Sequence, residues 1–414
     1  TQSTQLMDII YLLPSKSDFP NKTAIFFYKL CLICYYSGMP NFWMKSLPFP
    51  KKFIVPYRIY SRIITVLVYI FIISEFAAIF TQKNLSMKQK SNQMVYIMSH
   101  PMLWSYSISF TRQANKVRKI LVDIMKLKEV YNDVAVEKRM MKKSKFYSRA
   151  FCSMCVVSML MYTFDAIMQV IKKEGTFTTI ITAWPMVDDP SVAANFLRLV
   201  WNVLWWYMMA RVLSVYAFVF SLTTCMSHQF IDLQSYFSSL HHIFASRSSQ
   251  RRKELNFETA FKIGIKLHLD TLKCVELSKS ICGWLFSGQI IFNITMFVIL
   301  MAQLLKAERN LMLAGAIGIA AFCIVLGTGL FVCNAGDVTV EASELSTAMY
   351  LSGWENCQGQ SSVRIRKLVM ISIVVAQRPV VIKGLGFMDL SYQSYVSLVK
   401  STYSVFSLVF QQSQ

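Results

Sequence analysis

The stretch from Ile63 to Phe80, IITVLVYIFIISEFAAIF, has a single charged residue, Glu75, in eighteen positions. A helix needs roughly 20 apolar residues to cross a hydrocarbon core about 30 Å thick, so this stretch is predicted to span a membrane. Similar stretches follow it along the chain. The seven predicted spans are Ile63 to Phe80, Met94 to Phe110, Ala150 to Ile171, Phe196 to Met226, Ile281 to Leu305, Leu311 to Cys333 and Leu390 to Phe410.

The composition also indicates a membrane protein. Of the 414 residues, 54% are hydrophobic and 16% are charged, against about 25% charged in an ordinary soluble domain. No Ser- or Gly-rich linker separates the spans, so we expect one continuous, all-α polytopic membrane protein with seven transmembrane helices. The second span is the weakest prediction, because His100 and Pro101 interrupt it.

The positive charges predict the orientation in the membrane. The chain has 43 Lys and Arg against 22 Asp and Glu, a formal net charge of +21. Of these 43, 33 fall in the N-terminal segment and the second, fourth and sixth loops, and 7 fall in the other loops. Because basic loops are retained on the cytoplasmic side, we expect the N-terminus inside and the C-terminus outside. Most of the charge then faces membrane lipid, and no aromatic residues alternate with it in the pattern of a nucleic-acid site.

This orientation divides the chain into four parts. Residues 1–62 form a cytoplasmic N-terminal segment, and residues 63–333 hold six spans with cytoplasmic helix extensions at 111–149 and 227–280. Residues 334–389 form a second cytoplasmic segment, and residues 390–414 hold the last span. The long inward segments are only modestly polar, which favours packed helices; an amphipathic coat on the membrane surface is the alternative.

Motifs for enzyme chemistry are missing from the sequence. It has no phosphate-binding loop, dinucleotide-binding motif, nucleophile elbow or zinc-protease motif. The adjacent His241 and His242 point about 100° apart on a helix and cannot jointly bind a metal. We therefore expect neither an enzyme nor a bound cofactor or metal.

The C-terminal quarter holds the most specific pattern. It runs from Ser343-Glu344-Leu345 through Ala376-Gln377-Arg378-Pro379 to Ser401-Thr402-Tyr403-Ser404, and in this order it resembles the insect odorant receptor family. The segment Cys225-Met226-Ser227-His228-Gln229-Phe230 resembles the moth pheromone-receptor branch of that family.

The resemblance implies a ligand-gated, non-selective cation channel in the plasma membrane of a sensory-neuron dendrite. It implies a heterotetramer with the odorant co-receptor subunit, in which the cytoplasmic extensions anchor the subunits to one another and the last span lines the pore. By the resemblance, Phe406 and Val409 lie at an extracellular hydrophobic gate, and Thr402 lies one turn inward. A seven-span receptor that couples to an intracellular signalling protein is the alternative.

The last span has one polar stripe, whose residues recur every three or four positions. Such a stripe faces either water or a neighbouring helix, because polar groups are costly in lipid. A cation at Lys400 would repel permeant cations, so we expect the stripe to contact another subunit. Its residues are Gln393, Ser397, Lys400, Ser404, Ser407 and Gln411.

The outer halves of the second to sixth spans are rich in aromatic and methionine side chains. Such side chains form adaptable apolar cavities with few polar anchors, and we expect a volatile, long-chain ligand there whose oxygen accepts from Thr295, Tyr162 or His100. Ordinary packing between spans is the alternative for most of these residues. The candidate ligand-binding residues are Tyr96, His100, Met161, Tyr162, Phe164, Met168, Trp201, Trp205, Phe292, Thr295 and Met296.

Four charged residues fall within or near the same region. Glu75, Asp165, Arg198 and Arg211 each cost about 2.5 to 3.5 kcal/mol at the centre of a bilayer, so each should have a partner. We expect Asp165 and Arg198, which lie in adjacent spans, to form a structural pair.

Overall fold

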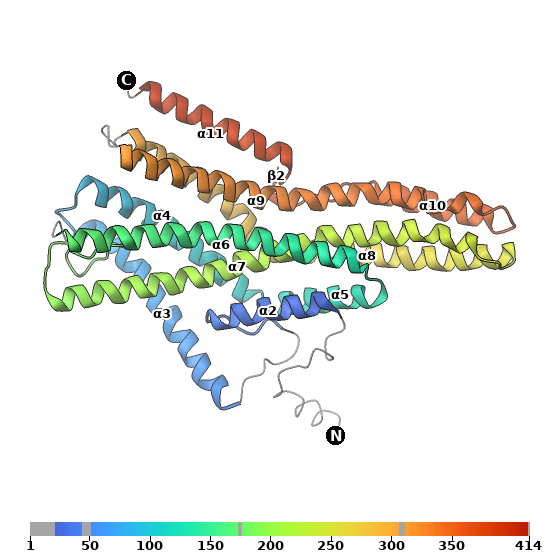
Figure 1. Ribbon diagram of the computed structural model, residues 1–414, viewed down its shortest axis with the longest axis horizontal. Coiled ribbons are helices and arrows are strands. Elements are labelled where there is room, and N and C mark those ends of the chain that lie inside the picture. The colour runs from blue at the N-terminus through green and yellow to red at the C-terminus, as the bar shows by residue number, and fades with distance from the viewer. Residues whose placement is uncertain (1–20, 44–50, 173–175, 306–310, 413–414) are drawn as a thin grey trace.

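The computed structural model describes residues 21–43, 51–172, 176–305 and 311–412. Within these ranges the chain is almost entirely helical, and the long helices run along one axis of an elongated molecule (Figure 1). The all-α class expected from the sequence is confirmed. The helices that contain the predicted spans are α3 (Lys51–Thr81), α4 (Met87–Arg112), α6 (Val134–Ile171), α7 (Val192–Ser239), α8 (Gln250–Leu305), α9 (Leu311–Tyr350) and α11 (Tyr392–Gln412).

Five segments of the described chain are long and apolar enough to cross a membrane, judged by length and composition. The second and seventh predicted spans form α4 and α11, whose 26 and 21 residues also reach the length of a span. Helix α4 begins with a capping box between Ser86 and Gln89. The five segments are Ile54–Thr81, Val134–Ile171, Val192–Ala245, Gln250–Met301 and Ala321–Asn356.

Helix α7 lies at the centre of the bundle. Every residue from Ser214 to Phe230 is buried, because neighbouring helices cover this part of α7 on all sides. Helices α2 (Lys22–Tyr36), α6, α8 and α9 pack against it. The ring of Phe218 contacts the rings of Phe27, Phe42 and Phe110, so residues before the first predicted span belong to the same core.

One end of the molecule, at the right of Figure 1, is a projection of long helices. The 56 residues of α8 extend about 84 Å at 1.5 Å per residue, much further than the bilayer core. Helix α10 (Ser362–Ala376) packs against α9 beside the short helices η3 (Leu240–Ala245) and η4 (Trp354–Asn356). Glu258 of α8 forms salt bridges with Lys262 of the same helix and with Arg364 of α10. The second salt bridge joins α10 to α8.

Helix α5 (Ala114–Val130) packs against α8 and α2. Its Lys128 forms a buried ion pair with Asp232 of α7. Asp133 then caps the start of α6, since its Oδ1 accepts from the amides of Ala135 and Val136 and its Oδ2 accepts from Ser235. Both carboxylates fix the turn between α5 and α6 against α7.

A small hairpin returns the chain to the membrane before α11. Strands β1 (Lys383–Gly384) and β2 (Met388–Asp389) pair antiparallel, with Lys383 opposite Asp389. The turn between them has positive φ at Leu385 (56°) and Gly386 (78°). No strand was predicted here, because strands of two residues are too short to show an alternating pattern.

Candidate functional site

The outer ends of α3, α4, α6 and α7 meet in an aromatic cluster. We define the outer aromatic cluster as Phe71, Tyr96, His100, Tyr162, Trp201 and Trp205. The ring of Tyr96 stacks on His100, with centroids 5.0 Å apart, and meets Tyr162 and Trp205 edge to face at 5.7 and 5.9 Å. Phe71 contacts Trp201 and His100 at 5.6 and 5.9 Å. Met296 and Phe292 of α8 pack against the same core.

His100 is the polar centre of this cluster. The indole Nε1–H of Trp205 donates to His100 Nε2 (3.0 Å), and an indole nitrogen can only donate. The other ring nitrogen, Nδ1, therefore holds the proton and donates to Oε1 of Glu75 (2.7 Å). Glu75 thus finds a partner, and both nitrogens of His100 are occupied. The prediction that His100 donates to a ligand is wrong for this arrangement, because its ring has no free N–H.

Three buried polar atoms at the cluster have no hydrogen-bond partner among the described residues. They are the hydroxyl of Tyr96, Nε1 of Trp201 and Oε2 of Glu75. A buried donor or acceptor left unpaired costs about 1–3 kcal/mol. In an interior otherwise built from rings and methionines, these atoms are the available anchors for a small polar group.

The remaining candidates lie away from the cluster. Met161 and Phe164 are 51% and 63% exposed on the outside of α6, where they would face lipid, so the structure does not bring them to the cluster. Met168 of α6 and Thr295 of α8 are half-buried. Of the eleven predicted residues, the structure joins seven: Tyr96, His100, Tyr162, Trp201, Trp205, Phe292 and Met296.

The loop of residues 176–190 covers the outer end of the cluster. Ile180 packs into its core, and Gln82 at the end of α3 holds the loop with three hydrogen bonds. Its Nε2 donates to the carbonyls of Thr182 (2.8 Å) and Pro185 (2.9 Å), and its Oε1 accepts from the amide of Val187 (3.1 Å). The loop is thus a fixed cover over the candidate site.

Arg198 at the outer end of α7 also binds this loop. Its guanidinium donates to the carbonyls of Met186, Val187 and Asp189. Asp165 instead accepts from Gln169 of its own helix (3.0 Å). The predicted pair between Asp165 and Arg198 is therefore wrong: the backbone carbonyls of the loop satisfy the arginine without a carboxylate.

Arg211 lies deeper on α7 and is bound by neutral groups. It donates to the hydroxyls of Ser107 (2.8 Å), Thr65 (3.1 Å) and Thr111 (3.4 Å) and lies over the ring of Trp104, 4.8 Å from its centroid. These contacts join α3, α4 and α7 below the cluster. The partners of Arg211 are thus three hydroxyl groups and the face of an aromatic ring.

Helix α11 lies at the edge of the bundle, above α9 in Figure 1. Tyr395, Leu398 and Val399 face α8 and α9, whereas four residues of the predicted polar stripe, Gln393, Ser397, Lys400 and Ser404, are exposed. The side chains of the predicted gate residues Thr402, Phe406 and Val409 lie outside the described part of the chain. One polar face of the last helix is therefore left free by its own subunit.

Two residues of this site, Phe71 and Gln82, were not among the predicted ones. Phe71 lies within Ile63 to Phe80, the most uniformly apolar stretch. No sequence pattern there distinguishes a ring that faces a ligand from a ring that packs against other helices. Gln82 ends the same stretch, and a polar residue there reads as the start of a loop. Neither the partner of Glu75 nor the folded loop has a local signal, because both depend on residues about 25 to 100 positions apart.

Comparisons with known proteins agree with this architecture. The family model described as 7tm Odorant receptor matches residues 80–403. No curated protein matches the sequence. The structure of the insect olfactory receptor OR5 from Machilis hrabei is similar, with a TM-score of 0.73 and 15% identity over 93% of this chain and 97% of that one.

The same Machilis hrabei receptor in complex with eugenol is similar with a TM-score of 0.71 and 14% identity, over 93% of this chain and 97% of that one. At such low identity the two structures show a common fold. Because the family model matches well over half of the sequence, the chain belongs to the 7tm odorant receptor family.

Proposed function

We propose that this protein is the odorant-binding subunit of a heteromeric, ligand-gated, non-selective cation channel. Its ligand is a volatile apolar molecule, probed first with long-chain pheromone-like compounds, and its site is the outer aromatic cluster with Phe292 and Met296. Its partner is the odorant co-receptor subunit in the plasma membrane. The similar receptor solved with eugenol supports a small-molecule ligand.

The single observation behind this site is the set of unpaired polar atoms in an apolar cluster. Tyr96 and Trp201 each hold a buried donor without a partner among the described residues. A ligand oxygen that accepts from either donor would offset the cost of burying it, while rings and Met296 contact the alkyl chain. Since His100 is fully bonded, its role is to hold Trp205 in place.

Two surfaces support assembly with other subunits. The free polar face of α11 is costly in lipid and, since it carries Lys400, suits a contact with a neighbouring subunit rather than the path of cations. On α10, in the predicted cytoplasmic segment, Met370, Ile371 and Val374 are 62%, 65% and 59% exposed. A contiguous apolar stripe outside the membrane marks a protein contact, and we assign it to the co-receptor.

The proposal is tested by expressing the chain with the co-receptor and recording current while intracellular nucleotide signalling is blocked. A fast ligand-evoked current that needs both subunits is expected. Current that disappears when signalling is blocked would instead indicate a receptor coupled to an intracellular signalling protein. A panel of apolar volatiles that differ in chain length and in the oxygen group identifies the ligand class.

The site is tested separately by replacing Trp201 with Phe, which removes the unpaired donor and keeps an aromatic ring. Potency is expected to fall for oxygen-bearing ligands and to stay the same for a hydrocarbon of equal length. An equal loss for both would place the effect in packing rather than in hydrogen bonding.

A further inference from the structure

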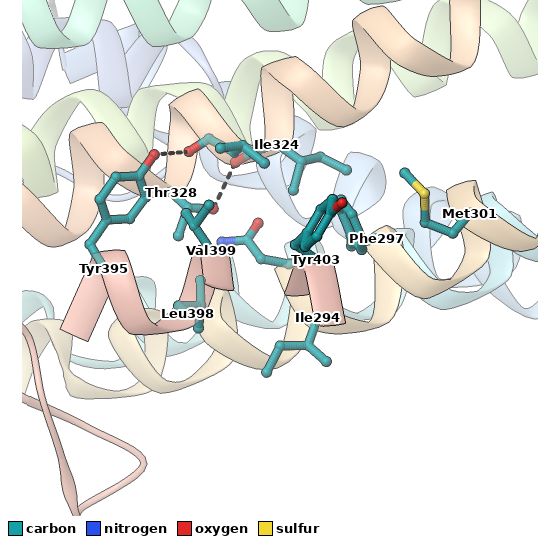
Figure 2. Close-up of a pocket in the computed structure, with 11 residues that line it drawn as sticks. Ile294, Phe297, Met301, Ile324, Thr328, Tyr395, Leu398, Val399 and Tyr403 are labelled. Atoms are coloured by element: carbon teal, nitrogen blue, oxygen red, sulfur yellow. Dashed lines mark hydrogen bonds between the residues drawn. The ribbon is translucent and has the colours of Figure 1, made fainter. Parts of the chain in front are cut away.

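A cavity of about 300 Å³ lies between α8, α9 and α11 (Figure 2). Figure 2 shows side chains of α8, α9 and α11 converging on it. Its volume is at the lower end of the range of about 300–1,000 Å³ for small-molecule pockets. It is lined by Asn293, Ile294, Phe297, Met301, Ile324, Val325, Thr328, Tyr395, Leu398, Val399 and Tyr403.

Asn293 gives this apolar cavity a specific chemistry. The residue is 4% exposed, and its Nδ2 has no hydrogen-bond partner among the described residues. Its Oδ1 accepts from Nε2 of Gln289 (3.1 Å), and Oε1 of Gln289 accepts from the hydroxyl of Tyr216. This chain of bonds fixes the amide, so its two N–H groups remain as donors.

Two hydroxyls of the lining donate to backbone carbonyls. Thr328 donates to the carbonyl of Ile324 (2.7 Å), and Tyr395 donates to the carbonyl of Val325 (3.1 Å). The site therefore suits an apolar molecule with an oxygen that accepts a hydrogen bond, such as an ester, ketone or ether. A free small molecule and the ester-bearing chain of a lipid share this chemistry.

The cavity also shares walls with two functional parts of the molecule. Phe292 and Met296 of α8 pack on the outer aromatic cluster, and the adjacent Asn293 and Phe297 line the cavity. Ile324 of α9 contacts the cluster core and lines the cavity as well. The remaining wall is α11, so an occupant would wedge between the ligand-binding bundle and the last helix.

We propose that this cavity is a second ligand site, for an apolar molecule or lipid chain whose acceptor oxygen binds Asn293, and that its occupancy changes the position of α11. The effect on α11 as a pore helix rests on the proposed channel function. Binding itself does not, because it can be measured without current.

The test uses photo-crosslinking in the full chain co-purified with the co-receptor and reconstituted in vesicles. One arm uses a photoactivatable long-chain methyl ester, and the other uses a phosphatidylcholine with the same photoactivatable group on its acyl chain. Crosslinked peptides are mapped by mass spectrometry. Labelling within 294–301, 324–328 or 395–403 is expected.

Two variants and one matched control define the site. Asn293→Leu keeps the volume and removes the donor, and labelling is expected to fall roughly tenfold, as for one lost hydrogen bond to a buried donor. Val399→Phe fills the cavity and should also abolish labelling. Val298→Phe adds the same ring at a position on α8 that is 44% exposed and does not line the cavity, and labelling should persist.

The outcomes separate the alternatives. Labelling by the ester alone indicates a free small molecule, and labelling by the phospholipid as well indicates a lipid chain. Absence of labelling in these segments with both probes, or equal labelling of the parent protein, Asn293→Leu and Val399→Phe, would overturn the site. Specific labelling in a protein that passes no ligand-evoked current would keep the site and reject the channel function.

Discussion

At the scale of single residues, the bonds of His100 decide how the candidate site is built. Without His100, Oε1 of Glu75 would lose its hydrogen-bond donor and the indole of Trp205 would lose its acceptor. The three residues come from α3, α4 and α7. They therefore act as one unit that holds these helices at a fixed distance around the aromatic rings.

Replacing Trp205 with Phe is expected to lower ligand potency at least fivefold. The change keeps an aromatic ring but leaves Nε2 of His100 without a donor, which costs about 1–3 kcal/mol. Dose–response curves for evoked current measure the effect, with surface expression determined in parallel. Trp206→Phe is the control, because its indole bonds Thr163 of α6 outside this unit. A similar loss in both variants would contradict the role given to His100.

The sequence predicted the residue types of the site better than their bonds. Tyr96, Trp201 and Trp205 could be chosen because aromatic residues in the outer halves of spans are visible in the sequence. Met161 and Phe164 could not be separated from them, since the apolar spans show little difference between lipid-facing and inward faces. The pair of Asp165 and Arg198 failed because a folded loop, absent from any local pattern, supplies carbonyl partners to the arginine.

At the scale of elements, the loop of residues 176–190 depends on Gln82. Removing three hydrogen bonds with Gln82→Ala should loosen this cover, at about 0.5–1.5 kcal/mol for each bond. We expect current to decay several-fold faster after ligand is washed out. Rapid solution exchange on membrane patches gives the decay rate.

Gln89→Ala is the matched control for this experiment. Gln89 belongs to the capping box at the start of α4 and is not bonded to the loop. Unchanged decay in Gln82→Ala, or equal acceleration in both variants, would show that the loop does not control release of ligand.

The turn between α5 and α6 depends on Asp133. The hydrogen bond from Ser235 and those from the backbone amides of Ala135 and Val136 lower the pKa of Asp133 below its usual value. A pKa that is lower in the folded than in the unfolded state stabilises the folded protein. This stabilisation is present at pH values above the unfolded pKa of about 3.9 and is lost as the pH falls through the folded pKa. Asp133→Ala should cost about 0.5–2 kcal/mol at neutral pH, as for other helix caps.

The difference in thermal stability between the parent protein and Asp133→Ala should therefore be constant from pH 7 to about pH 5 and shrink below about pH 4. Thermal unfolding followed by size-exclusion chromatography in detergent measures it. Asp133→Asn, which still caps a helix, should show a smaller loss at neutral pH. A difference that grows on acidification would contradict the assignment.

The elements themselves were largely predictable. Six of the predicted spans each lie within one helix, and the seventh begins two residues before α11. A long apolar run leaves few structures other than a helix in a membrane, and α4 continues through Pro101. Helix extensions were predicted beyond the spans, and α7, α8 and α9 pass from span to projection without interruption. The amino-acid composition changes where each helix leaves its predicted span, but the helical backbone continues.

At the scale of the whole molecule, the exposed stripe on α10 is expected to hold the subunits together. Ile371→Glu places a charge in the centre of this stripe and should reduce co-purification with the co-receptor at least tenfold, since an unpaired charge in an apolar contact is costly. Arg366→Glu, also exposed on α10, is the control. Undiminished co-purification of Ile371→Glu would place the interface elsewhere.

Helix α8 joins the parts of the protein that must respond to one another. Its 56 residues contain no proline, and they touch the outer aromatic cluster, the second cavity and α10 in turn. A helix of this kind tilts as a rigid body. A protein bound at the Gln250 end of α8 would therefore be coupled to occupancy of the aromatic cluster at its other end, and a force applied there would in turn change the affinity for ligand.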